Sequence, residues 1–563
     1  MQNFLNKLLI GVVFFSFSYS KYPDAVGVNG MVVSSNDLAT EIGVNILKDG
    51  GNAVDAAVAV GFALAVTHPG AGNIGGGGFM VIRFSDGTST SIDFRETAPA
   101  LADKDMFLDV NGNVVKGKSW NTALAVGVPG SVAGFGYAHD KYGSKRWSDL
   151  IQPSVKLARY GYQIGYLNYN LLNSTYYRKY LSSDKETKKI FYKDEGFKLN
   201  EVFVQKDLAK TLSRIASYGY RDFYEGQISK KIIKCMNRTG GIISYNDLKN
   251  YMPVERNPIV FNYRDNKVIT MPPSSSGGIV LAQILNQLEN FNINEFNFHG
   301  LKHIHYMSEI ERRAYADRAE VLGDSDFIDI PIDSLISDSY AKIKVRDIDC
   351  CKASISVDIE PFNSKYYESE ETTHYSVVDK WGNAVSVTTT INGWYGSGIT
   401  VDEAGFLLNN EMDDFSIKPG YPNKYGLVGS WANSIAPNKR MLSSMTPTII
   451  EDSNGDLLAI IGSPGGSTII TTIAQIISNI IDFKMPLKDA VEAPRTHHQW
   501  LPDKIFLESN FLHKSIYDDL LSLNHTVDYK QSIGEANCIM YYKEGDIFMG
   551  VSDDRRNGFA KGY

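Results

Sequence analysis

A threonine-rich segment in the last third of the chain carries the first candidate chemistry. Thr372, Thr373 and Ser376 bear hydroxyls, and they follow a serine- and acid-rich stretch, residues 352–371, that predicts an exposed linker. If the chain is cut there, a threonine hydroxyl becomes a nucleophile at a new N-terminus. The freed α-amine, with a pKa of ~8, is then its base. Taken alone, the local pattern favours an ordinary threonine at the start of a strand, because threonine is common there.

The elements that follow predict where this segment lies. Residues 373–378 and 384–391 read as strands of a hairpin, and pairing residue 379 with residue 384 places Thr372 opposite Ile391, one step from Thr390 and Asn392. Residues 446–450 and 457–461 predict a second strand pair. A glycine-rich loop at 462–467 and a helix over 468–481 come next.

The N-terminal region predicts a buried helix that runs into a glycine block. Apolar residues four apart predict a helix over 38–46, and 53–66 is apolar on all sides, as in a buried helix. Gly75 to Gly78 then precede a strand expected over 80–84. The order helix, glycines, strand is the reverse of a phosphate-binding loop, so we expect tight backbone packing here. Residues 130–350 read as helices with polar connections.

Composition and charge exclude several classes of protein. The chain has 563 residues, 43% hydrophobic and 21% charged, which is typical of a folded protein. A formal net charge of −8 disfavours binding to nucleic acid. The four cysteines are too few and too irregular for a disulfide scaffold or a metal site.

The first twenty residues have the pattern of a secretory signal. Lys7 precedes a mostly apolar run over 8–17, and Ser18 and Ser20 stand where a signal peptidase requires small residues. A run of ten residues is shorter than the ~20 that span a bilayer as a helix. We therefore expect removal of residues 1–20, no membrane span afterwards, and a periplasmic or secreted protein.

Several long blocks resemble one family, in that family's order. The segment 372–379, followed by 382–386, is similar to the processing site of the γ-glutamyltranspeptidases (glutathione hydrolases), of the N-terminal-nucleophile hydrolase superfamily. Further matching blocks are the glycine block at 73–80, Asp-Phe-Arg-Glu-Thr-Ala-Pro at 93–99, 407–415, Leu-Ser-Ser-Met at 442–445, and Gly-Ser-Pro-Gly-Gly-Ser at 462–467.

The resemblance implies an autocatalytic proenzyme. The Thr372 hydroxyl would attack the carbonyl of Glu371, an N-to-O acyl shift would form an ester, and hydrolysis would free Thr372 as an N-terminus. The same hydroxyl would take the γ-glutamyl group of glutathione, and water, an amino acid or a dipeptide would resolve the acyl-enzyme. Residues 21–371 and 372–563 would be the large and small subunits of a heterodimer. No metal or organic cofactor is implied.

The resemblance also assigns the site residues. A γ-glutamyl donor presents a carboxylate and an ammonium, which require partners of opposite charge. By this resemblance, the donor carboxylate would be bound by Arg95, Ser443 and Ser444, and its ammonium by Asn392, Glu411 and Asp414. The oxyanion would be stabilised by Gly465 and Gly466, and Thr390 would hydrogen-bond to the nucleophile. Tyr425 would cover the site from a lid loop over 419–429.

The implied fold is a four-layer αββα sandwich of the α+β class, in which both fragments form one intertwined catalytic domain. Two alternatives stay open: an amidase of the same fold, such as a β-lactam acylase, and an inactive protein that binds γ-glutamyl peptides. The lid and the pair Arg95 and Asp414 favour a glutathione-type donor over the acylase, and the presence of Thr372 disfavours the binding protein.

Overall fold

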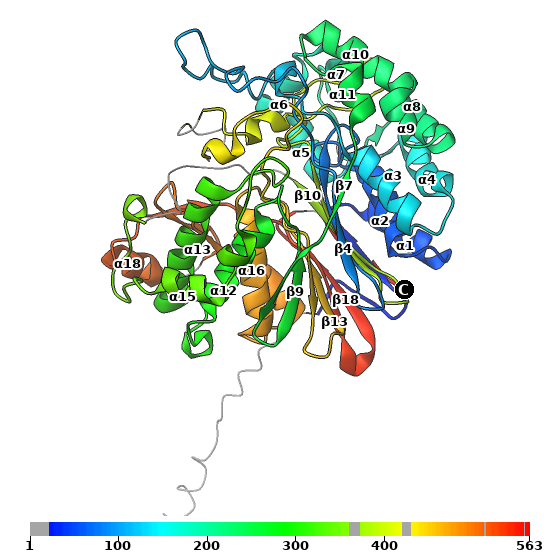
Figure 1. Cartoon of the computed structure of the whole chain (residues 1–563). Helices are drawn as coiled ribbons and strands as arrows, with labels where there is room; N and C mark the ends of the chain where they lie inside the picture. The colour runs from blue at the N-terminus through cyan, green and yellow to red at the C-terminus, as the bar shows by residue number, and fades with distance from the viewer. Residues whose placement is uncertain (1–21, 360–371, 419–420, 422–428, 512–513, 557) are drawn as a thin grey trace, which may run out of the picture.

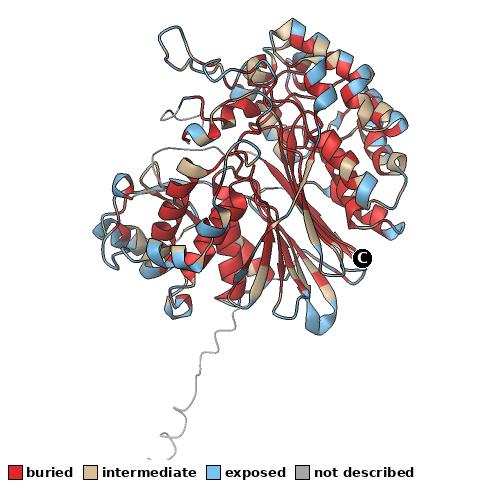
Figure 2. Ribbon diagram, viewed as in Figure 1, coloured by how far each residue is buried: buried red, intermediate tan, exposed pale blue. Residues whose placement is uncertain are grey.

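The protein is built from two antiparallel seven-stranded sheets, stacked face to face between two layers of helices (Figure 1). The computed structural model describes residues 22–359, 372–418, 421, 429–511, 514–556 and 558–563. Buried residues concentrate in the two sheets and in the helix faces that cover them (Figure 2). This is the four-layer αββα arrangement expected from the sequence.

The first sheet contains the strand that begins after Thr372. Its order is β19 (Phe559–Gly562), β2 (Met31–Ser34), β10 (Thr373–Val378), β11 (Ala384–Thr390), β3 (Gly77–Arg83), β4 (Ser89–Asp93) and β7 (Val254–Arg256). Helices α1 (Asp37–Lys48), α2 (Ala53–Thr67), α3 (Ser131–Tyr142), α4 (Trp147–Tyr160) and α8 (Lys206–Tyr218) form the layer outside it. Every residue of α2 is buried, as its all-round apolar sequence predicts.

The second sheet packs on the other face of the first. Its order is β1 (Ala25–Gly27), β18 (Ile547–Ser552), β17 (Asn537–Tyr542), β13 (Leu457–Ile461), β12 (Thr448–Glu451), β9 (Asn266–Thr270) and β8 (Ile259–Tyr263). Helices α12 (Gly277–Leu288), α13 (Leu301–Val321) and α16 (Thr468–Ile481) cover it. Side chains alternate along β2, so that Val32 joins the outer core while Met31 and Val33 join the core between the sheets.

Both sheets combine strands from before and after residue 372. In the first sheet, β10 and β11 lie between β2 and β3, which come from the N-terminal part of the chain. In the second sheet, β12 pairs with β9, and β18 pairs with β1. The parts of the chain on either side of residue 372 are therefore interleaved within the same cores.

The remaining elements surround this sandwich. The helices are α5 (Tyr166–Asn173), α6 (Thr175–Leu181), α7 (Lys185–Phe191), α9 (Arg221–Glu225), α10 (Gln227–Thr239), α11 (Tyr245–Asn250), α14 (Ile332–Leu335), α15 (Asp338–Val345), α17 (Leu487–Glu492) and α18 (Lys514–Ser522), and the strands are β5 (Tyr162–Gln163), β6 (Val202–Phe203), β14 (Thr496–His497), β15 (Ile505–Glu508) and β16 (Val527–Lys530). Among the described residues, no helix is both long and apolar enough to cross a membrane.

The hairpin exists, but the predicted register is wrong by one residue. Val378 pairs with Ala384 and Thr373 pairs with Thr389. Asp379 belongs to the turn, because its carboxylate accepts hydrogen bonds from the N–H groups of Trp381 at 2.9 Å and Asn383 at 3.0 Å. Continuing the ladder by one step places Thr372 opposite Thr390.

Two further expectations need correction. Part of the 352–371 stretch is packed rather than exposed: Ser356 is fully buried, and its carbonyl accepts a hydrogen bond from the indole N–H of Trp500 at 2.7 Å. Residues 360–371 lie outside the described part of the chain. The region 130–350 also contains β7, β8 and β9. Burial alternates with a period of two along β8, but the exposed positions are Val260 and Asn262, so the sequence shows this alternation only in part.

The glycine block packs as expected. Strand β3 begins within it, at Gly77. A Cβ at Gly76 would collide with the carbonyl oxygen of Thr390, and a Cβ at Gly75 with the carbonyl oxygen of Leu407. Only glycine lets these backbones approach so closely. The block therefore fixes the end of β11 near Thr372.

Candidate active site

A small cavity at the end of β10 and β11 brings together most of the residues assigned from the sequence. Its volume is about 20 Å³, which is room for about one water molecule. The lining residues are Arg95, Thr372, Thr390, Asn392, Glu411, Asp414, Ser443, Ser444, Met445, Gly466 and Ile469. Gly465 precedes the lining residue Gly466 in the sequence but does not itself line the cavity. Glu371 and Tyr425 lie outside the described residues.

Thr372 immediately precedes β10 and is buried, with 5% of its surface exposed. Thr390, opposite it by register, also pairs with Gly77 of β3. The Thr390 hydroxyl accepts a hydrogen bond from the N–H of Asn392 at 2.7 Å. Asn392 has a left-handed backbone, with φ of 67°, and this turn carries its side chain to the carbonyl of Asn410 at 3.0 Å. The end of β11 is therefore held by its pairing with β3 and by the contacts of Asn392 in the turn that follows.

Arg95 follows β4 and is the only cation lining the described cavity. Its guanidinium contacts Asp414 at 2.5 Å and Glu411 at 2.8 Å, and Glu96 lies 3.7 Å away. It also donates to the carbonyl oxygens of Met441 and Leu442, each at 3.3 Å. The side chain is 1% exposed. Arg95, the predicted carboxylate-binding group, therefore pairs directly with Glu411 and Asp414, two of the predicted ammonium-binding groups.

Burial dominates the electrostatics of this cluster. It raises the pKa of Glu96, Glu411 and Asp414, and the positive charge of Arg95 opposes that rise for all three carboxyls. Burial therefore favours the neutral forms of these three carboxyls. An additional cation beside them, such as the ammonium of a zwitterion, would lower their pKa and be stabilised by their ionised forms.

The two serines are held by groups that the sequence reasoning missed. Arg318 of α13 donates to the Ser444 hydroxyl at 3.1 Å and to the Ser276 hydroxyl at 2.8 Å. The Ser276 hydroxyl donates in turn to the carbonyl of Ser443 at 2.6 Å. Arg318 is 4% exposed. Helix α13 also buries Glu309, Glu311, Arg312, Arg313 and Asp317, so the sequence does not single out Arg318 as the residue that reaches the serines.

The loop between β13 and α16 presents backbone donors to the same end of the sheets. Gly465 and Gly466 have φ of 134° and 55°, conformations that favour glycine. Within the described part of the chain, neither N–H group donates a hydrogen bond. Free N–H groups ahead of a helix N-terminus are suited to stabilising a developing oxyanion.

The histidines near the site are buried and bonded within the fold. The His374 ring lies 2.9 Å from the Thr388 hydroxyl and 3.1 Å from the Ser376 hydroxyl. Burial lowers its pKa to about 3. His497 lies 2.9 Å from the Thr471 hydroxyl and 2.8 Å from the Gln499 side chain. These contacts are those of structural histidines within the fold.

A four-layer αββα sandwich with a threonine at the start of a central strand is the architecture of N-terminal-nucleophile hydrolases. The family model described as gamma-glutamyltranspeptidase matches residues 39–563. The chain belongs to the gamma-glutamyltranspeptidase family.

Relatives and solved structures agree with this assignment. The chain is 49% identical to the glutathione hydrolase proenzyme of Escherichia coli, over 93% of this chain and 90% of that one. It is 40% identical to the Pseudomonas aeruginosa proenzyme, over 98% and 97%. The gamma-glutamyltranspeptidase structure from Helicobacter pylori is 47% identical, with a TM-score of 0.57, covering 58% of this chain and 94% of that one. A cephalosporin acylase from Bacillus halodurans shares the fold, at 23% identity and a TM-score of 0.81 over 98% and 99%.

Proposed function

We propose that this protein is a proenzyme that cuts itself between Glu371 and Thr372 and then acts as a glutathione hydrolase and γ-glutamyltransferase. The observation that carries the proposal is the cavity in which Thr372 lies with Arg95 and a set of buried carboxylates. The names of the relatives supply the substrate class, glutathione and related γ-glutamyl compounds.

Donor binding follows from the charges of the cavity. A γ-glutamyl group carries one carboxylate and one ammonium, so it enters without changing the net charge. Its carboxylate would take the place of Glu411 or Asp414 beside Arg95, with the hydroxyls of Ser443 and Ser444 as further donors. The freed carboxylates and Asn392 would then receive the ammonium. The γ-carboxamide carbon, at the other end of the glutamyl chain, would face Thr372.

Catalysis is assigned to residues of this chain. The Thr372 oxygen attacks the γ-carbonyl carbon while its proton passes to the freed α-amine of the same residue. The N–H groups of the Gly465–Gly466 loop stabilise the tetrahedral oxyanion. The carbon–nitrogen bond breaks, the departing amine takes the proton, and a γ-glutamyl ester remains on Thr372. Attack by water yields glutamate, and attack by an amino acid or dipeptide yields a new γ-glutamyl amide.

Cleavage would give two chains, residues 21–371 and 372–563, that stay together as a heterodimer. The coverage of the Helicobacter pylori structure supports this proposal. Its solved chain is covered to 94% yet spans 58% of this chain, as expected for one fragment of a cut precursor. The N-terminal signal pattern supports export of the precursor to the periplasm or medium.

The test is mass spectrometry of the purified protein combined with release of a chromogenic amine from a γ-glutamyl anilide. We expect two fragments, with Thr372 at one N-terminus, and amine release. The Thr372→Ala variant should remain one chain and lose at least 10³-fold activity. Thr372→Ser is the matched control, because it keeps a hydroxyl and should cut slowly. An uncut wild type that still turns over substrate would refute the mechanism.

The same assay separates the alternatives. A β-lactam acylase would release the acyl group of a cephalosporin faster than it cleaves the anilide. A binding protein would bind γ-glutamyl peptides with no turnover after cleavage. The zwitterion-matched cavity favours the γ-glutamyl donor over a cephalosporin, and the presence of Thr372 in that cavity disfavours a protein that only binds.

A further inference from the structure

Two adjacent cysteines, Cys350 and Cys351, are exposed at the surface in a turn that follows α15. Their Sγ atoms lie 2.8 Å apart, so both side chains leave the turn on the same side. The other two cysteines of the chain, Cys235 and Cys538, are buried in the two cores. Neither exposed cysteine lines the Arg95 cavity. The thiols that solvent can reach are therefore gathered in one place, away from the proposed active site.

The backbone around this pair is fixed on both sides. The carbonyl of Asp349 accepts a hydrogen bond from the ring of the buried His305 at 2.7 Å, and its carboxylate accepts one from the N–H of Cys351 at 2.8 Å. On the other side, the N–H of Ala353 donates to the carbonyl of Leu523 at 2.7 Å. The two sulfurs are thus held as neighbours, which lowers the entropic cost of joining them.

A bond between adjacent cysteines would contribute little to stability. It closes no long loop, so it scarcely restricts the unfolded chain. Consecutive Cα atoms are about 3.8 Å apart, whereas the Cα atoms of ordinary disulfides lie roughly 4.4–6.8 Å apart. The bond would therefore be strained, and strained, exposed disulfides are the ones that are readily reduced. Such a pair suits reversible chemistry rather than a structural cross-link.

We propose that Cys350 and Cys351 form a reversible redox pair, which is oxidised to a disulfide between neighbouring residues by exchange with small, soluble disulfides. The inference goes beyond the proposed function and does not depend on it, because no residue of the Arg95 cavity takes part. The proposed export would place the pair in a compartment where disulfides persist.

The exchange has two steps. The thiolate of Cys350 attacks one sulfur of the small disulfide, whose sulfur–sulfur bond breaks, and one small thiolate leaves. The thiolate of Cys351 then attacks the Cys350 sulfur of this mixed disulfide and releases the second small thiolate. The two protons of the cysteines pass to the two departing thiolates. Two protein thiols are oxidised to one disulfide, and the small disulfide is reduced to two thiols.

The contact between the sulfurs assigns this order. The hydrogen bond with Cys350 raises the pKa of the Cys351 thiol, and the positive charge of Lys302 opposes that rise. Since the thiolate is the attacking form, the first attack is assigned to Cys350. Once Cys350 is part of a mixed disulfide, its sulfur carries no negative charge. Cys351 then loses its proton more easily and can close the bond.

Trypsin provides a direct test, because it cuts after lysine and arginine. Residues 347–352 lie between Arg346 and Lys352 and contain both exposed cysteines and no other. The purified full-length wild type is equilibrated with mixtures of 2-mercaptoethanol and bis(2-hydroxyethyl) disulfide in the presence of a metal chelator. Free thiols are then alkylated, and this peptide is measured by mass spectrometry. Neither reagent is a γ-glutamyl compound, so the result is independent of the proposed function.

We expect the peptide to pass from two alkyl groups to none, with a mass lower by two hydrogens, as the disulfide replaces the thiol. Dithiothreitol should restore the first form. The Cys351→Ser variant should accumulate the mixed disulfide on Cys350 to roughly fivefold the wild-type level or more, because it cannot complete the second step. Cys235→Ser, at a buried position, is the matched control and should titrate as the wild type does.

Three results would overturn the inference. The first is a peptide that keeps both alkyl groups in excess disulfide. The second is a wild type in which both cysteines carry separate adducts instead of a bond to each other. The third is a disulfide that joins two protein molecules, detected by electrophoresis without reductant.

Discussion

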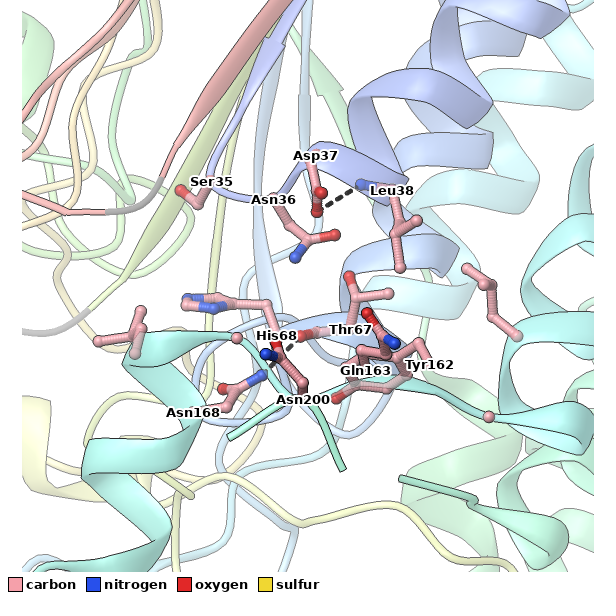
Figure 3. A pocket seen from close by; sticks show the side chains of 14 residues that line it. Ser35, Asn36, Asp37, Leu38, Thr67, His68, Tyr162, Gln163, Asn168 and Asn200 are labelled. Atoms are coloured by element: carbon pink, nitrogen blue, oxygen red, sulfur yellow. Dashed lines mark hydrogen bonds between the residues drawn. The ribbon is translucent and has the colours of Figure 1, made fainter. Parts of the chain in front are cut away.

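The two sides of β10 carry cavities that differ in volume and in the charge of their lining residues. On the β11 side, a cavity of about 20 Å³ holds an arginine against three buried carboxyls. On the β2 side, a cavity of about 400 Å³ at the ends of β2 and α2 is lined mainly by neutral amides and hydroxyls (Figure 3). The first presents a fixed pattern of charge. The second presents neutral hydrogen-bonding groups.

The difference has an energetic basis. Buried charges are stabilised only by partners in good geometry, so a charged cavity discriminates strongly and depends on every member. Neutral amides lose less solvation and tolerate replacement of one partner by another. We therefore expect substitutions on the β11 side to have large effects and substitutions on the β2 side to have smaller ones.

The largest effect is expected from Arg95→Ala. It removes the proposed partner of the donor's carboxylate and leaves three buried carboxyls without their cation. We expect kcat/KM for the donor to fall at least 10³-fold and the free energy of unfolding to fall by about 3–5 kcal/mol. Steady-state kinetics and chemical denaturation measure the two quantities.

Arg83→Met is the matched control for that variant. Arg83 forms a buried ion pair with Glu451 at 2.8 Å, away from the cavity. Its loss should reduce stability with kcat/KM nearly unchanged. Normal donor affinity in Arg95→Ala would contradict the assignment of that side of β10 to the donor.

A smaller loss is expected from Gly465→Ala. The new Cβ would lie 2.5 Å from the Thr468 hydroxyl and 3.0 Å from the Gly534 Cα, so the loop must shift. Loss of a well-placed oxyanion donor typically costs about 10²–10³-fold in kcat. Gly455→Ala, at a positive-φ turn residue with open space around it, controls for backbone strain. Equal kcat losses in the two variants would argue against an oxyanion role.

Arg318→Met should act mainly on donor affinity. Arg318 does not line the cavity but bonds to Ser444 and Ser276, so we expect it to act on the donor as a positioning residue. We expect the donor KM to rise about tenfold, as when a charged hydrogen bond of roughly 1.5–3 kcal/mol is lost, with a smaller change in kcat. Arg318→Lys should recover part of the affinity. A fall in kcat alone would show that the serines serve chemistry rather than binding.

The smallest effects concern how stability depends on pH. The slope has opposite signs for Glu96, on the β11 side, and for His68, on the β2 side. Burial raises the pKa of Glu96 to about 8 from an ordinary 4.5, so the folded state binds the extra proton and stability declines as pH rises from 4.5 to 8. Burial lowers the pKa of His68 to about 3 from an ordinary 6.5, so stability declines as pH falls from 6.5 to 3.

Glu96→Gln and His68→Asn test these slopes separately. Glu96→Gln should flatten the dependence of unfolding free energy on pH between 6.5 and 8, and His68→Asn should flatten it between 3 and 4.5, because the two opposite slopes overlap between 4.5 and 6.5. Denaturant titrations at steps of one pH unit measure both. A flattening in the wrong window would show that another group titrates there.

Much of the fold and of the candidate site could be predicted from the sequence, because the patterns that indicate them lie in contiguous segments. The buried helix α2, strands β10 and β13, and helix α16 follow from runs of apolar residues with clear stops. The residues of the Arg95 cavity came from family blocks in order. The one-residue register error arose because the Asp379 side chain caps the turn, which strand periodicity does not reveal.

The features that could not be predicted depend on contacts between residues far apart in the sequence. Arg318 meets Ser444 from 126 positions away in the sequence, and no local pattern announces that contact. The β2-side cavity gathers Ser35, Thr67, Asn168 and Asn200 from separate elements. A cavity is a property of how elements pack, so its lining leaves no contiguous trace in the chain.

The interleaving of strands from both sides of residue 372 determines what cleavage would produce. An ordinary subunit interface joins two bodies that fold first and then associate. Here the contact between the fragments is the pair of cores itself, with β10 paired to β2 and β12 to β9. Separating the fragments would therefore mean unfolding both. The assembly should not exchange partners on dilution, and neither fragment should be recoverable as a soluble protein when expressed alone.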